Sequence, residues 1–180
     1  MIVGKNNTTI ERRRFTLAHE LAHKVIPEIG KEVETEKEKE RLMHRFSGAF
    51  LMPGEHLKAE IGSTRHAFAY RELIQLKHHY GVSASSFLMR LLALGMVSSD
   101  AITTAFRTYA RTWKTSEPEP LALSASPRSE TPMRFQQLVY RAIAEQMISL
   151  PRAAELLNQP MQEVENQVRG PAARHADHRQ

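Results

Sequence analysis

Two histidines and a glutamate, His19, Glu20 and His23, stand in the pattern H-E-x-x-H. In a helix, residues four apart lie about 40° apart around the axis and about 6 Å apart along it. Two imidazoles placed in this way can bind one zinc ion at about 2.0–2.1 Å from each nitrogen. Glu20 is turned by about 100° from His19, so its carboxylate can reach a water molecule instead of the metal. The pattern therefore predicts a metal site at which a carboxylate takes a proton from water as the water attacks a carbonyl carbon.

The pattern carries weight only in a helix, because a chain with 9 histidines among 180 residues matches it by chance at a frequency of roughly a few per cent. The surrounding residues predict such a helix. Thr8 and Glu11 have the spacing of a capping box, and Pro27 closes the other end. From Phe15 onward, apolar residues fall on nearly every side, which predicts that this helix runs through the core.

The composition limits how such a site can be built. The chain has no cysteine, which excludes disulfides, thiolate nucleophiles and cysteine-bound zinc, so a metal must be held by histidines and carboxylates. Its 180 residues suit one domain or two small ones, and a net charge of +5 permits contact with nucleic acid without requiring it. No apolar run is long enough to span a membrane, and the first residues do not resemble a signal peptide. A cytoplasmic protein is expected.

A second helix is predicted to begin in the charged run at residues 31–41 and to end before Pro53-Gly54. Apolar residues follow the charged run at steps of three and four. The glutamates of the run suit the positive end of a helix dipole, and most of them are expected to lie in solvent. From these residues alone, Glu36, Glu38 and Glu40 are nearly equal candidates for a third metal ligand.

The rest of the chain is predicted to be helical, with one interruption. Helices are expected at residues 55–61, 67–80, 83–94 and 100–113. Residues 115–132 hold four prolines among serines and threonines and are predicted to be a linker. The predicted organisation is therefore a domain at 1–114, the linker at 115–132, a small helical unit at 133–169 and a disordered polar tail at 170–180.

Two segments resemble the ImmA/IrrE family of metallopeptidases. They are Arg14-Phe15-Thr16-Leu17-Ala18-His19-Glu20-Leu21-Ala22-His23 and Phe46-Ser47-Gly48-Ala49-Phe50-Leu51-Met52-Pro53. Members typically read R-F-T-x-A-H-E-x-G-H and later E-x-x-A-N-x-F-A-x-x-L-x-M-P. The resemblance implies a mainly α fold, in which an α+β zincin-like core holds very little sheet because only Met1–Asn7 remain for it.

The resemblance also implies a ligand set and a function. When the segments are aligned on Phe46, the family's glutamate falls on Glu40, which becomes the third zinc ligand beside His19 and His23. Glu20 is then the catalytic base of a zinc-dependent metallo-endopeptidase. The implied substrate is a protein, a helix-turn-helix transcriptional repressor that is cleaved in a stress or mobile-element response.

The chain departs from the family pattern at Met43, where the family has a small Ala, and at His44, and it also differs in the sequence before the H-E-x-x-H helix. His44 replaces the family's Asn one turn after Glu40, and it is predicted to orient a zinc-bound imidazole; direct coordination and a partly exposed position are the alternatives. Such peptidases usually have strands before the H-E-x-x-H helix, and an edge strand pairs with the extended substrate. The near absence of that sequence here suggests a short or truncated member. It leaves a second interpretation, a non-catalytic, zinc-stabilised regulatory or antitoxin-like binding module.

Three weaker patterns concern oxyanion stabilisation, the C-terminal unit and a cluster of basic residues. Candidates for stabilising an oxyanion are His56, His66, Tyr70, His78, His79 and Tyr80. The C-terminal unit resembles a helix-turn-helix, but its last helix offers mainly Gln and Glu, so direct nucleic-acid binding is not expected and docking to protein or oligomerisation is favoured. Arg107, Arg111 and Lys114 are expected to form an ordinary solvated helix face.

Overall fold

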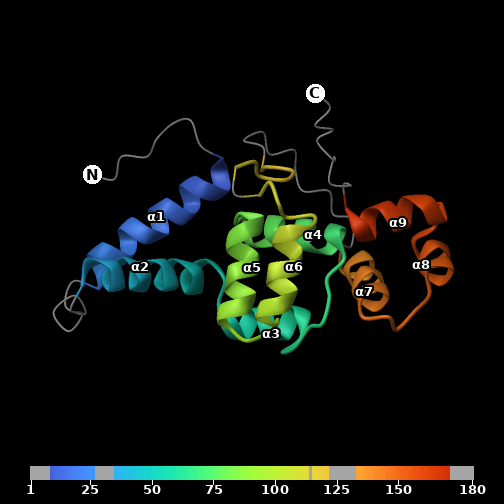
Figure 1. The fold of residues 1–180 in the computed structure, drawn as a ribbon, viewed down its shortest axis with the longest axis horizontal. Helices are drawn as coiled ribbons and strands as arrows, with labels where there is room; N and C mark the ends of the chain where they lie inside the picture. The colour runs from blue at the N-terminus through green and yellow to red at the C-terminus, as the bar shows by residue number, and fades with distance from the viewer. Residues whose placement is uncertain (1–8, 27–34, 114, 122–132, 171–180) are drawn as a thin grey trace, which may run out of the picture.

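The computed structural model describes residues 9–26, 35–113, 115–121 and 133–170. Within these residues the chain forms nine α-helices and no β-strand, which confirms the mainly α fold (Figure 1). The helices are α1 (Ile10–Val25), α2 (Glu36–Leu51), α3 (Gly54–Ile61), α4 (Tyr70–Tyr80), α5 (Ala84–Ala93), α6 (Ser99–Arg107), α7 (Met133–Ala144), α8 (Leu150–Leu157) and α9 (Met161–Arg169). The pair α1 and α2 lies at one end of the molecule, α3 to α6 form the middle, and α7 to α9 lie at the other end.

The first helix begins one residue later than its capping pattern predicts. Its N-cap is Thr9, whose side chain accepts a hydrogen bond from the backbone N–H of Arg12. The predicted capping box of Thr8 and Glu11 is wrong, because Glu11 is completely buried and binds elsewhere in the interior. The predicted stop at Pro27 lies outside the described residues.

The second helix begins at Glu36, behind the N-cap Thr35, whose hydroxyl accepts a hydrogen bond from a backbone N–H of the first turn. Residues 31–34 of the predicted start lie outside the described part of the chain. α1 packs against α2 through a stripe that includes the buried Ala18 and Ala22, and the buried residues of α2 include Met43 and Ser47. The side chains beside this contact are brought close together.

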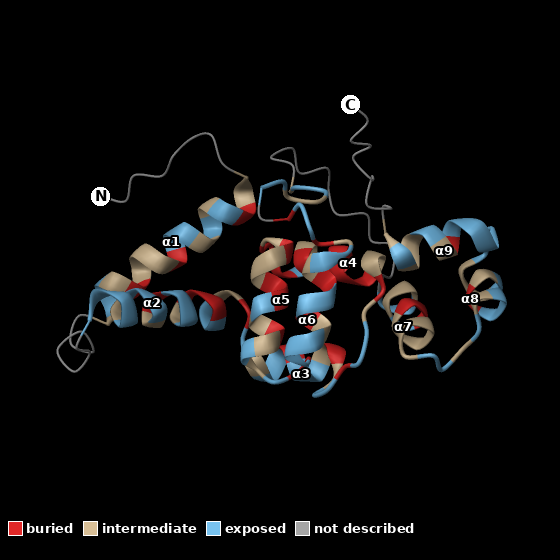
Figure 2. Ribbon diagram, viewed as in Figure 1, coloured by how far each residue is buried: buried red, intermediate tan, exposed pale blue. Residues whose placement is uncertain are grey.

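α1 does not run through the core, contrary to the sequence prediction. Leu17 is 49% exposed and Val25 is 60% exposed, and only Glu11, Ala18 and Ala22 are buried (Figure 2). α1 packs mainly against α2, and a single neighbour covers only one stripe of a helix. The apolar residues on the other sides of α1 therefore remain partly accessible.

The main core lies between α3, α4, α5 and α6. Its buried residues include Leu57, Leu73, Phe87, Leu91 and Ile102. Two boundaries differ from the prediction by more than one residue. α4 begins at Tyr70 rather than residue 67, and α6 ends at Arg107 rather than residue 113, because Thr108 leaves helical geometry and residues 108–113 form turns.

The C-terminal helices form a second, smaller core around Val139, Ala153 and Val164. α7 and α9 pack against α4. A buried guanidinium also joins this group to the middle of the molecule, since Arg65 donates hydrogen bonds to Glu145 at 2.7 Å and to Glu72 at 2.8 and 3.0 Å. None of the helices in the described residues is long and apolar enough to cross a membrane.

Candidate metal centre

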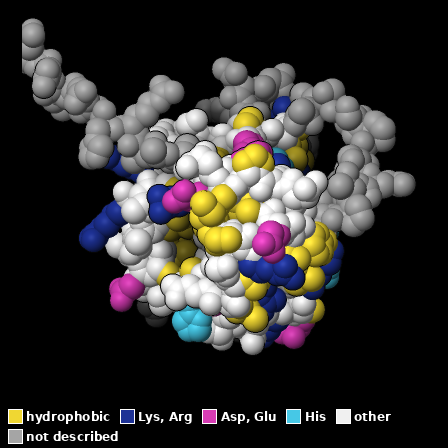
Figure 3. Space-filling model, turned by 90° about the vertical axis from the view of Figure 1, so that its right-hand side faces the viewer, with side chains coloured by type: hydrophobic (Ala, Val, Ile, Leu, Met, Phe, Trp, Pro, Cys, Tyr) yellow, Lys and Arg dark blue, Asp and Glu magenta, His cyan; other side chains and the backbone are white. Residues whose placement is uncertain are grey.

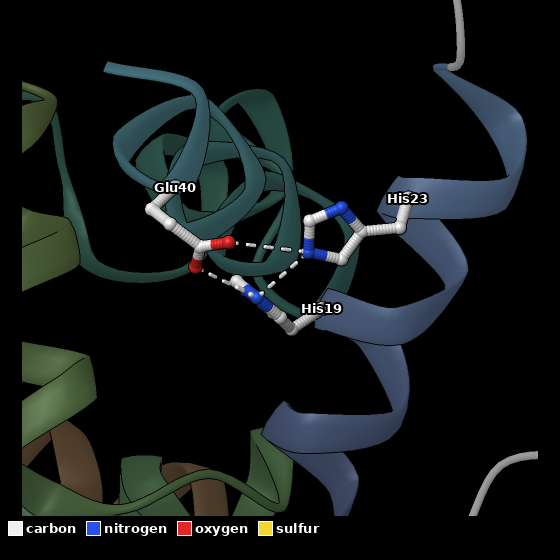
Figure 4. A group of neighbouring side chains, drawn as sticks. All are labelled: His19, His23 and Glu40. Atoms are coloured by element: carbon white, nitrogen blue, oxygen red, sulfur yellow. Dashed lines mark hydrogen bonds and ion pairs between the residues drawn. The ribbon is translucent and has the colours of Figure 1, made fainter. Parts of the chain in front are cut away.

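Three side chains that the sequence predicts as ligands meet beside the contact of α1 and α2. The Nε2 atoms of His19 and His23 are 3.2 Å apart. The Glu40 carboxylate approaches both of them, with Oε2 at 3.2 Å from the first and Oε1 at 3.5 Å from the second (Figure 4). Among the described residues, these three form the one group of at least three His, Asp or Glu side chains close enough to share a metal ion.

The helices account for this convergence. His19 and His23 are one turn apart on α1, next to the stripe of Ala18 and Ala22 that packs against α2. Glu40 lies on α2 at a three-residue step from Met43, which is buried. The residues that close the helix contact thus also aim the imidazoles and the carboxylate at one point.

The structure separates Glu40 from the glutamates that resemble it in sequence. Glu36 forms an exposed ion pair with Lys39 at 3.4 Å. Glu38 accepts a hydrogen bond from the hydroxyl of Thr35 at 3.0 Å. Of the three open candidates on α2, only Glu40 reaches the two imidazoles.

The three groups differ in their access to solvent. The side chains of His19, His23 and Glu40 are 15%, 30% and 48% exposed, so the carboxylate side of the group is the open side. Burial lowers the pKa of His19 below its ordinary value of 6.5, and the nearby His44 acts in the same direction, against the opposing effect of Glu40. A neutral imidazole, the form that binds a metal, is thereby favoured at neutral pH.

Glu20 lies beside this group without joining it. Its side chain is half-buried, and its charge acts on His19 by raising the pKa of that imidazole, in opposition to burial. The described residues place it outside the set of three converging ligands. Glu20 is therefore close enough to act electrostatically on His19 while it stays outside the ligand group.

His44 contacts both a histidine and the glutamate of the group. Its ring meets the ring of His19 edge to face with centroids 4.7 Å apart, and Phe15 lies on it at 5.8 Å. Its Nδ1–H donates to the backbone carbonyl of Glu40 at 2.8 Å. The Nδ1 atom of His19 is buried without a hydrogen-bond partner among the described residues. His44 therefore packs against the His19 ring but forms no described hydrogen bond with it.

The residues considered for stabilising an oxyanion lie elsewhere in the molecule. His56 and Tyr80 bind each other at 2.7 Å, and burial raises the pKa of Tyr80 to about 12. His79 packs beside this pair. His66 contacts Glu145, and His78 contacts the carbonyl of Glu119. Tyr70 packs against Tyr109 and Trp113. Each of these side chains has a structural neighbour that accounts for its position.

The donor set fits a tetrahedral zinc ion. With bonds of about 2.0–2.1 Å, neighbouring ligands of such an ion are about 3.3 Å apart. The two imidazole nitrogens are 3.2 Å apart, and each has one oxygen of the Glu40 carboxylate at 3.2 or 3.5 Å, so the three groups lie close enough to share one ion. Two imidazole nitrogens and one carboxylate oxygen are also the ligand types of catalytic zinc sites, which keep a fourth position for water or substrate.

Sequence reasoning missed the buried ionic groups that hold the surrounding helices. Lys77 is completely buried and binds Glu11 of α1 and Glu117. Residues 115–121, predicted as the start of a linker, supply Glu117 and pack against α4 through Glu119, which pairs with Arg71. No local pattern links residues so far apart in sequence, so no signal was available to find these contacts.

Comparison with known proteins places the chain in a family. Searches of curated proteins and of solved structures find no match. A family model described as the IrrE N-terminal-like domain, Peptidase_M78, matches residues 1–92, just over half of the 180-residue chain. The matched segment contains the whole ligand group and both helices that carry it. The chain belongs to the IrrE N-terminal-like family, a family of metallopeptidase type.

Proposed function

We propose that this protein is a zinc-dependent metallo-endopeptidase, in which His19, His23 and Glu40 hold the metal and Glu20 is the general base. The observation that carries the proposal is the convergence of two imidazole nitrogens, 3.2 Å apart, with the Glu40 carboxylate, whose Oε2 lies 3.2 Å from His19 and whose Oε1 lies 3.5 Å from His23. Membership of a metallopeptidase family supports the same chemistry.

The ligand side chains and Glu20 have different roles in the proposed reaction. The two imidazoles and the Glu40 carboxylate fix the position of the ion, and the exposed side of Glu40 leaves room for a substrate. A bound zinc lowers the pKa of a water molecule and polarises the peptide carbonyl. The Glu20 carboxylate takes the proton of that water during attack and passes it to the leaving amine.

We further propose that the substrate is a protein, a helix-turn-helix transcriptional repressor cut in a stress or mobile-element response. The family resemblance supports this class of substrate. The C-terminal helices offer a surface on which a protein could dock or a second copy associate, because hydrophobic, basic and acidic side chains of the described residues lie beside one another there (Figure 3). Met147 and Met161 of this region are 74% and 52% exposed. The mixed surface does not favour binding to nucleic-acid phosphates.

A second candidate function is a zinc-stabilised binding module without catalysis. The exposed apolar residues Leu17 and Val25 on α1 favour it, because such a helix face can bind a protein partner without a reaction. The two functions differ in their dependence on Glu20, which is not a ligand in either.

The Glu20→Gln variant separates the two functions. If the protein is a peptidase, the variant keeps about one equivalent of zinc per chain but no longer cleaves a purified candidate repressor. Glu38→Gln is the matched control, since Glu38 is an exposed glutamate whose described contact is with Thr35. If the Glu20→Gln protein acts on the repressor or on the cell as well as the unmodified protein does, the peptidase assignment is wrong and the binding module remains.

A further inference from the structure

The helix that carries both imidazoles is fixed to the middle of the molecule at its first turn. Glu11 of α1 is completely buried, and its Oε1 accepts hydrogen bonds from Lys77 of α4 at 3.0 Å and from the backbone N–H of Leu121 at 2.8 Å. These contacts lie at the end of α1 that approaches the segment 115–121 in Figure 1. Arg14 adds a weaker contact to the carbonyl of Tyr80 at 3.5 Å.

Lys77 stands at the centre of this attachment. Its Nζ also donates to Oε1 of Glu117 at 2.9 Å, and that same oxygen accepts the backbone N–H of Ala84 at 2.8 Å. The side chains of Lys77 and Glu11 are 0% exposed and that of Glu117 is 8% exposed. We call Glu11, Lys77 and Glu117 the buried ion cluster.

Charges buried to this degree are held firmly in place. A buried ammonium without an anionic partner is strongly unfavourable, so the position of Lys77 on α4 restricts where the Glu11 carboxylate can lie. Glu11 in turn is part of the first turn of α1. The main core thereby fixes one end of an otherwise partly exposed helix.

The rest of α1 has few other buried contacts, so the attachment at its first turn is important for holding the helix in position. Besides Glu11, the buried residues of α1 are Ala18 and Ala22, so most of this helix is held mainly from one side, by α2. α2, which carries Glu40, is fixed separately, since Arg90 of α5 donates to the carbonyl of Met52 at 3.1 Å. The two sides of the ligand group thus have different attachments to the main core.

We propose that Lys77 is a positioning residue of the metal centre, acting through Glu11. His19 lies eight residues after Glu11, about 12 Å along a rigid helix, so a fixed first turn sets where the imidazoles face Glu40. The inference rests on the proposed function, because it explains how that site is kept in its binding geometry before a metal arrives.

The decisive comparison is between two substitutions of Glu11. Glu11→Ala removes the attachment while Lys77 keeps its partner Glu117, so the buried charge stays paired and the main core is expected to fold. Glu11→Gln keeps a side-chain oxygen that can accept from Lys77 and Leu121, and it should restore the geometry. Glu55→Ala is the control, because Glu55 forms an exposed pair with Lys58.

The first readout needs no metal. The chain has no cysteine, so Lys24→Cys on α1 and Ala93→Cys on α5, both exposed positions, can carry spin labels for a distance measurement. The distance distribution should broaden or shift in Glu11→Ala and match the unmodified chain in Glu11→Gln and Glu55→Ala. An unchanged distribution in Glu11→Ala overturns the inference, whether or not the protein binds a metal.

The second readout is Co²⁺ binding, followed by the visible absorption of the ion, in chains without the labels. Glu11→Ala should bind Co²⁺ about tenfold more weakly, with an altered spectrum, and Glu11→Gln should restore both. A moved α1 with unchanged Co²⁺ affinity and spectrum overturns the positioning role. If the distance changes as expected but the unmodified chain binds no Co²⁺, the attachment of α1 is supported and the zinc site itself is refuted.

Discussion

The Nε2 atom of His19 lies 3.2 Å from Oε2 of Glu40, although the two residues belong to different helices. Neither helix places them together by itself. The approach depends on the packing of α1 against α2, at which Ala18 and Ala22 of α1 and Met43 of α2 are buried. The geometry of the proposed site is thus a consequence of this helix crossing.

The three glutamates of α2 should differ sharply in their effect on metal binding. Glu40→Ala removes a ligand and should weaken zinc affinity by more than about 100-fold, beyond the range seen for outer-shell changes. Glu36→Ala should leave it unchanged, since Glu36 pairs with Lys39 in solvent. Competition with a chromogenic chelator measures both. Equal losses in the two variants would show that the effect belongs to the charge of this helix and not to a ligand.

His44 should affect the site through packing and the position of Glu40. Its ring contacts His19, and its Nδ1–H binds the Glu40 carbonyl. His44→Ala should therefore lower zinc affinity by about tenfold without loss of stoichiometry. His44→Asn, which restores the residue typical of the resembling family, should lower it less. A complete loss of zinc in His44→Ala would instead indicate direct coordination.

The crossing of α1 and α2 should not tolerate a larger side chain. Ala22 is completely buried there, so Ala22→Leu should destabilise the protein by about 1–3 kcal/mol and displace the imidazoles from Glu40. Leu17→Ala is the comparison on the same helix, because Leu17 is 49% exposed and its truncation should change stability little. Urea denaturation and zinc titration of both variants check this. Retained zinc affinity in Ala22→Leu would contradict the dependence of the site on this crossing.

The sequence alone predicts the two histidine ligands but does not identify the glutamate that accompanies them. The spacing of His19 and His23 indicates two ligands on one helix face, but Glu36, Glu38 and Glu40 are alike in local sequence, and only the family resemblance favoured the last. The buried Met43 does not separate them either, because Glu36 and Glu40 stand seven and three residues before it, and both steps share a helix face. The assignment of these residues as metal ligands stays a prediction.

The burial of α1 was predicted wrongly and the buried ion pairs were missed, because both depend on how distant parts of the chain pack together. Apolar residues on every side of α1 suggested a core helix, yet burial is set by the number of neighbouring elements, and among the described helices α1 packs mainly against α2. The contacts of Lys77 with Glu11 and Glu117 join distant parts of the chain, so no local pattern announces them. The same holds for Arg65 and its two carboxylates.

Acid should weaken the attachment of the C-terminal helices. Burial of Glu145 acts to raise its pKa, but hydrogen bonds from Arg65 and His66 outweigh it and hold that pKa below the ordinary 4.5. A carboxyl with a lowered pKa in the folded state contributes stability that is present above pH 4.5 and is lost as the pH falls below it.

The measurement is the free energy of unfolding between about pH 3 and 6, compared with that of Glu145→Gln. The difference between the two proteins should shrink as the pH falls below 4.5, because the unmodified carboxyl becomes neutral there. A difference that stays constant across this range would show that the ionisation of Glu145 contributes nothing to the attachment.

The proposed function requires that one metal ion binds between α1 and α2. The most direct test is anomalous X-ray scattering at the zinc absorption edge from crystals grown with one equivalent of Zn²⁺. One strong anomalous peak is expected about 2.0–2.2 Å from Nε2 of His19, Nε2 of His23 and a carboxylate oxygen of Glu40. A structure without a peak at these atoms, or with zinc held only by other residues, would contradict it.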